Sequence, residues 1–83
     1  MISGAMTLKD KRRIVKSVKD RISHEFNVSI AEVGALDAHR KAIIGVSMVG
    51  NESRFIRECL DKILKHLKMH REAVVVDYQI DLV

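Results

Sequence analysis

The chain has 83 residues, with 15 Lys and Arg against 11 Asp and Glu, which gives a net charge of +4. Its single cysteine, Cys59, excludes an internal disulfide framework and fits a reducing compartment. No stretch approaches the ~18 consecutive apolar residues of a membrane span, and the N-terminus shows no secretory signal pattern. We therefore expect one small cytoplasmic domain over residues 1–83.

The first predicted element is an amphipathic helix that begins at residue 8. Thr7 is suited to cap it, with Asp10 three residues later. Its apolar residues recur at helical spacing along one arc: Leu8, Ile14, Val15, Val18, Ile22 and Phe26. We expect the helix to end near residues 26–27.

Two strands are predicted next. Residues 28–33 are rich in β-branched side chains and roughly alternate between apolar and polar. Residues 34–41 form a polar connection. Residues 42–49 are apolar on both faces, which is typical of a strand inside a sheet.

A second helix and a third strand complete the predicted elements. Asn51 or Ser53 can cap the helix, and its expected buried face consists of Phe55, Ile56, Cys59, Leu60, Ile63, Leu64 and Leu67. Residues 74–82 have a period of two, with Val74, Val76, Tyr78, Ile80 and Leu82 on one side and Val75, Asp77, Gln79 and Asp81 on the other. Because each helix has one apolar face, both should cover one face of a mainly antiparallel sheet. The expected fold is an α+β two-layer sandwich.

Four runs of the chain resemble the bacterial YlxP-like family, a family of unknown function. They are residues 4–13, 26–33, 42–49 followed by Asn51, and 76–80, and the block Leu-Lys-Asp-Lys-Arg-Arg at residues 8–13 is the most specific. The resemblance implies a ferredoxin-like βαββαβ fold, in which the first strand lies centrally between the third and the last. Genes of the family often lie beside genes for translation initiation and ribosome maturation, which implies a role linked to RNA or the ribosome.

This chain departs from the family pattern in two places. The family begins with a full strand before the Gly-Ala turn, whereas only three residues precede Gly4 here. The start of the chain is incomplete, or residues 1–6 form a stub strand, or a neighbouring chain supplies the pairing; we expect a short stub supplemented by dimerisation. His39 stands where the family commonly has a Trp.

A basic surface on the first helix is the main candidate site. Residues 8–21 carry seven Lys or Arg and two Asp, a surplus larger than the charge of the whole chain. Lys9, Arg12, Lys16 and Lys19 fall within a sector of about 80°, which suits a ladder of phosphate contacts. The alternative is an ordinary solvated face. The predicted nucleic-acid-binding residues are Lys9, Lys11, Arg12, Arg13, Lys16 and Lys19.

The crowding of cations at the start of this helix supports an anion there. The helix dipole disfavours a cation in the first turn by roughly 0.3–1 kcal/mol, and free N–H groups at a helix start bind phosphate. Lys11 lies in the middle of the apolar arc, so we expect it beyond the sheet and near the same anion.

Other chemistry is weakly indicated. His66 and His70 have a metal-binding spacing but no third ligand, and Asp37 and His39 are more typical of a solvated turn than of an acid–base site. Base stacking on the sheet is disfavoured because residues 42–49 contain no aromatic side chain. We therefore expect a non-enzymatic RNA- or ribosome-associated module with no cofactor, no metal and no small-molecule substrate. The alternative is a self-associating, dimeric protein-interaction domain.

Overall fold

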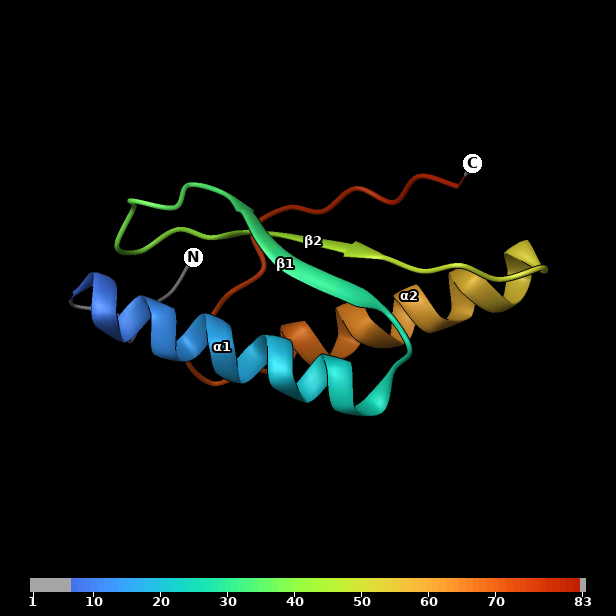
Figure 1. The fold of residues 1–83 in the computed structure, drawn as a ribbon, viewed down its shortest axis with the longest axis horizontal. Coiled ribbons are helices and arrows are strands. Elements are labelled where there is room, and N and C mark those ends of the chain that lie inside the picture. Colours follow the sequence, from blue (N-terminus) through green and yellow to red (C-terminus); the bar gives the residue numbers. More distant parts are fainter. Residues whose placement is uncertain (1–6, 83) are drawn as a thin grey trace.

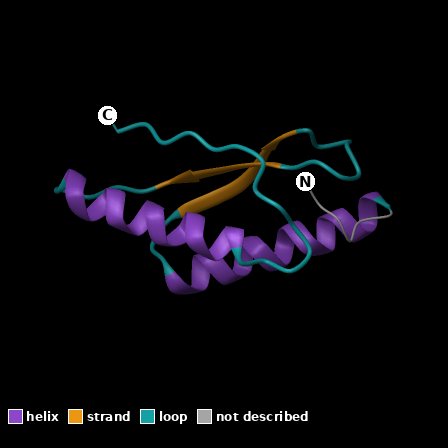
Figure 2. Ribbon diagram, turned by 180° about the vertical axis from the view of Figure 1, so that it is seen from behind, coloured by secondary structure: helices purple, strands orange, loops and turns teal. Residues whose placement is uncertain are grey.

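Two helices lie on one face of a two-stranded sheet. The computed structural model describes residues 7–82 (Figure 1), in the order α1 (Leu8–Glu25), β1 (Ser29–Gly34), β2 (Ile43–Ser47) and α2 (Ser53–Lys68). The strands pair antiparallel, and both helices are on the same side of them (Figure 2). The predicted α+β arrangement is therefore confirmed at this level. The stub strand expected over residues 1–6 lies outside the described residues.

The capping of α1 is as predicted. The Thr7 hydroxyl oxygen accepts a hydrogen bond from the Asp10 backbone N–H at 3.1 Å, which satisfies one of the free donors of the first turn. At the other end the helix stops at Glu25, and the Phe26 N–H donates to the Ile22 carbonyl at 2.9 Å.

The start of α2 differs from the prediction. Glu52 occupies the N-cap position without a side-chain hydrogen bond, and Ser53 is already the first helical residue. Ile63 is the one fully buried residue of this helix, and Phe55 is 54% exposed although it was expected in the core. The reason is visible in Figure 1, where the first turns of α2 extend beyond the end of α1 and have no helix beside them.

The core lies between the helix layer and the sheet. Val18 and Ile22 of α1 form one buried cluster with Ile63 of α2. Ile14 and Val15 form a second cluster, against which Ala42 and Ile44 pack. Burying one such aliphatic side chain contributes about 1.5–3 kcal/mol, so the apolar arc read from the sequence is what holds α1 to the sheet.

The strand register decides which side chains face the helices. Ile30 lies opposite Val46 and Glu32 opposite Ile44, and these four face the helix layer. A register shift between Glu32 and Gly34 ends the regular ladder. Val33 and Ile43 alternate to the uncovered face, where they are 62% and 46% exposed.

The third strand predicted over residues 74–82 is wrong: these residues form no strand in the described structure. Val75 is half-buried, while Val74 and Val76 are 59% and 75% exposed. Paired strands lie ~4.7–4.9 Å apart, whereas a groove of about 760 Å³ lies beside β2, between residues 41–44 and residues 73–79. An alternating sequence alone does not form a strand when the neighbouring strand lies too far away to pair with it.

Candidate nucleic-acid interface

Lys11 is buried under the hairpin, and its predicted place beside an exposed anion is wrong. Its side chain is 0% exposed, and Nζ lies 2.7 Å from the Glu32 Oε2 of β1. The same ammonium donates to the carbonyl oxygens of Ala35 at 2.7 Å and Leu36 at 3.4 Å. The contact with Glu32 is an ion pair without hydrogen-bond alignment.

These contacts make Lys11 a structural residue that fixes the loop after β1 to the start of α1. The loop turns at Ala35, whose φ of 54° is in the left-handed region, so its carbonyl and that of Leu36 are presented to the ammonium. Glu32 is 13% exposed and faces the helix layer. A buried cation therefore meets one carboxylate and two carbonyls, which offsets its loss of hydration.

Two of the other predicted residues form ion pairs at the surface. Arg13 Nη2 lies 3.2 Å from Glu72 Oε2, and Lys16 Nζ lies 2.5 Å from Asp20 Oδ2 one helical turn later. All four side chains are well exposed, so each pair contributes about 1 kcal/mol or less. Because such pairs exchange readily with solvent, both cations remain accessible to a phosphate, although each now has a competing carboxylate.

The remaining three predicted cations have no acidic partner in residues 7–82. They are Lys9, Arg12 and Lys19, of which the first two are exposed and the third is half-buried. Lys9 lies opposite Val18, the centre of the buried arc, whereas Arg12 and Lys19 lie about 100–120° from it. The structure thus places Lys9, Arg12, Lys16 and Lys19 along one side of α1, while Arg13 lies on the flank that faces the chain after α2.

A second group of cations, at the end of α2, was missed by the sequence reasoning. Lys62, Lys65, Lys68 and Arg71 follow one another without an intervening Asp or Glu. Their spacing of three residues can be seen in the sequence. In the described structure Lys68 lies 5.4 Å from the centre of the Tyr78 ring, a cation–π contact.

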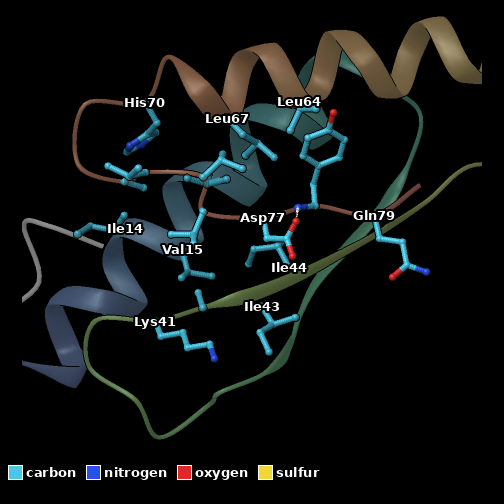
Figure 3. A pocket seen from close by; sticks show the side chains of 17 residues that line it. Ile14, Val15, Lys41, Ile43, Ile44, Leu64, Leu67, His70, Asp77 and Gln79 are labelled. Carbon is cyan, nitrogen blue, oxygen red and sulfur yellow. Dashed lines mark hydrogen bonds between the residues drawn. The ribbon is translucent and has the colours of Figure 1, made fainter. Parts of the chain in front are cut away.

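The groove beside β2 is lined mainly by aliphatic side chains (Figure 3). Val15, Ile44, Leu64 and Leu67 point into it from three elements. Asp37 and His39, the residues weighed for acid–base chemistry, are both exposed on the hairpin loop and do not line this groove.

The histidines and the cysteine considered as metal ligands each have a separate environment. His66 Nε2 is 3.0 Å from Glu25 Oε2, and its ring packs edge-on against Phe26. His70 Nδ1 accepts a hydrogen bond from the Glu72 N–H at 3.2 Å, and Cys59 is half-buried. Within residues 7–82, no three His, Cys, Asp or Glu side chains come together closely enough to hold a metal ion.

Neither α1 nor α2 combines the length and the hydropathy that a membrane-spanning helix requires.

Comparison with known proteins identifies the family to which the chain belongs. The family model "Protein of unknown function (DUF503)" matches residues 1–80, and the chain belongs to this family. The chain is also similar to the uncharacterized protein YlxP of Bacillus subtilis (strain 168). The two are 31% identical over 64 residues, which covers 77% of this chain and 70% of the relative. The YlxP-like resemblance is therefore confirmed, and no solved structure matches the chain.

Proposed function

We propose that this protein is a non-catalytic, cytoplasmic RNA- or ribosome-associated module that binds the phosphate backbone through α1. The observation that carries the proposal is the set of three cations, Lys9, Arg12 and Lys19, that have no acidic partner among the described residues. A free surface cation that meets a phosphate releases condensed counterions, and this release is the main source of backbone affinity.

The layout of the remaining side chains supports a binding role over a catalytic one. The groove is lined mainly by aliphatic groups, and the exposed Asp37 and His39 have no enclosing walls in the described part of the chain. General acid–base catalysis needs a positioned and partly enclosed pair. Contacts through phosphates alone carry little sequence information, so we expect weak sequence preference.

The test of this function is the neutralising variant Arg12→Gln/Lys19→Gln, measured by fluorescence anisotropy with a structured ribosomal RNA fragment. Losing two phosphate contacts should lower the log–log salt slope by about 1.8 and weaken binding by about tenfold at about 50 mM salt. The matched control is Arg54→Gln/Arg57→Gln, which removes the same charge from residues that already pair with Glu58 and Asp61. Equal binding by all three proteins would contradict the proposal, as would absence of binding by the native chain.

A second candidate function, self-association into a homodimer, is favoured by the uncovered face of the sheet. Both helices lie on the other face (Figure 2), and Val33, Leu36 and Ile43 expose 62%, 57% and 46% of their surface. The Val33 side chain leans over Gly45, where an added Cβ would lie 3.0 Å from Val33 Cγ1. Exposed apolar side chains on an uncovered sheet face are typical of an interface with a second copy.

For the dimer, the variant Val33→Lys/Ile43→Lys should abolish self-association without unfolding the chain, because two desolvated ammonium groups oppose the contact. Sedimentation equilibrium from micromolar to millimolar concentration is the measurement. The control is Val49→Lys, which changes an exposed valine that lies outside both strands. A native chain that stays monomeric at millimolar concentration would rule this function out.

We also propose that the fold is ferredoxin-like with a truncated first strand. The groove between residues 41–44 and residues 73–79 supports this, because a central strand separates the corresponding segments in that fold.

A further inference from the structure

The two walls of the groove beside β2 run in the same direction. Residues 41–44 and residues 73–79 line the groove, and a smaller hollow of about 160 Å³ lies further along, lined by Ile44, Val46 and residues 78–81. The later part of β2 therefore faces the later part of the other wall, and both segments run from left to right in Figure 1. One extended chain placed between them is antiparallel to both.

Both walls present backbone groups that have no backbone partner within residues 7–82. In that part of the chain β2 pairs with β1 alone, so the backbone groups on its other edge are open. Residues 75–82 make no backbone–backbone hydrogen bond there either, and the Tyr78 N–H donates to Asp77 Oδ1 at 2.8 Å instead. An open edge of this kind recognises an extended peptide by adding it as a strand.

The side chains that the helices contribute to the groove are aliphatic. Val15, Leu64 and Leu67 point into it (Figure 3), and Val74 and Val76 of the far wall are 59% and 75% exposed. Alternate side chains of an extended chain point to the same side, so every second residue of the occupant should be apolar and face the helices. The volume of about 760 Å³ falls within the ~300–1,000 Å³ typical of ligand sites.

The two ends of the groove differ in polar chemistry. Lys41 and His70 lie at the end where β2 begins, and Gln79 lies at the other end (Figure 3). Lys41 forms no ion pair with any of residues 7–82. His70 Nδ1 accepts a hydrogen bond from the Glu72 N–H at 3.2 Å, so Nε2 carries the proton and is a donor. An ammonium and an N–H donor at one end are suited to a carboxylate.

We propose that this groove binds the C-terminal peptide of a partner protein as an added β-strand antiparallel to β2. An antiparallel peptide ends where β2 begins, so its direction places its terminal carboxylate beside Lys41 and His70. Its backbone pairs with β2 on one side and with residues 75–79 on the other, and its apolar side chains pack against the helices. This surface is separate from the basic face of α1, and the inference does not depend on RNA binding.

The probe is a peptide of about seven residues, the length of an ordinary strand, in which valine alternates with threonine. Fluorescence anisotropy of a label at its N-terminus measures binding. The form with a free C-terminal carboxylate should bind about tenfold more tightly than the amidated form, because amidation removes a charge-assisted hydrogen bond. Methylation of alternate backbone nitrogens removes the donors to one wall and should weaken binding by at least about tenfold.

The variant Lys41→Gln should weaken binding of the carboxylate form by about tenfold and change the amidated form by less than about twofold. Its matched control is Arg40→Gln, which removes the same charge from the neighbouring exposed residue that does not line the groove. The control should bind both forms as the native chain does. Both positions are exposed, so neither variant should unfold the domain. Arg12→Gln/Lys19→Gln should also retain peptide affinity, which separates this inference from RNA binding.

Three results would overturn the inference. The first is a native chain that binds neither form at millimolar peptide, including a chain that sediments as a dimer whose mass and stability the peptide leaves unchanged, since a second copy then fills the groove. The second is binding that survives methylation of the backbone, which excludes an added strand. The third is an equal effect of Lys41→Gln and Arg40→Gln, which means that the carboxylate is not held at this end.

Discussion

The variant Lys11→Ala is expected to lower the free energy of unfolding by about 3–5 kcal/mol. It removes the ammonium that pairs with Glu32 at 2.7 Å and leaves a carboxylate that is 13% exposed without its cation. It also removes the donor to the carbonyls of Ala35 and Leu36. A domain of this size has a total stability of about 4–10 kcal/mol, so the variant should be marginally folded. Urea denaturation followed by circular dichroism measures the change.

Two further variants isolate the cause. Lys9→Ala changes an exposed lysine on the same helix and should alter stability by about 0.5 kcal/mol or less. Lys11→Met/Glu32→Leu removes both charges and should recover most of the lost stability, because apolar replacement of a buried ion pair is often neutral. If Lys11→Ala and Lys9→Ala have the same effect, the buried contact is not a source of stability.

The local features of the fold were predictable because their causes are local. The Thr7 cap, the end of α1 and its buried arc follow from residues within a few positions of one another. The position of Lys11 on that arc was also visible, but its partner was not. Glu32 reaches it only because the chain turns back through β1, and no short-range pattern reports such a contact.

The third predicted strand shows how a clear local pattern can mislead. Residues 74–82 alternate convincingly, yet a strand exists only where a neighbouring backbone lies within hydrogen-bonding distance. The groove beside β2 separates residues 73–79 from that strand.

The candidate site likewise contains one ion pair that the sequence predicts and one that it does not. The Lys16–Asp20 pair is implied by i,i+4 spacing, whereas the Arg13–Glu72 pair depends on how the end of α2 meets α1.

The two proposed surfaces are compatible because they lie on opposite sides of the molecule. The cations lie on the helices, which cover one face of the sheet (Figure 2). Val33 and Ile43 alternate to the other face, where they are exposed. A dimer through the sheet would carry two outward basic layers and could engage two stretches of RNA. Linking the two binding events would raise the overall affinity without any new contact.

The variant Ile22→Ala should lower the free energy of unfolding by about 2–5 kcal/mol. Ile22 is 2% exposed and packs in one cluster with Val18 of its own helix and Ile63 of α2. Truncation removes three buried carbon atoms and leaves a cavity where α1, α2 and the sheet meet, which no single element can fill by moving alone. Urea denaturation measures the loss, and Ile22→Val should cost only about 0.5–1.5 kcal/mol.

Two measurements show whether the loss arises from this junction. Val49→Ala, at a valine that is 96% exposed, should change stability by about 0.5 kcal/mol or less. A double-mutant cycle with Ile63→Ala should give a coupling energy of about 0.5–3 kcal/mol, because both truncations open the same space. Strict additivity would mean that the two side chains do not share one cavity, and the packing of α2 against α1 at this point would then be wrong.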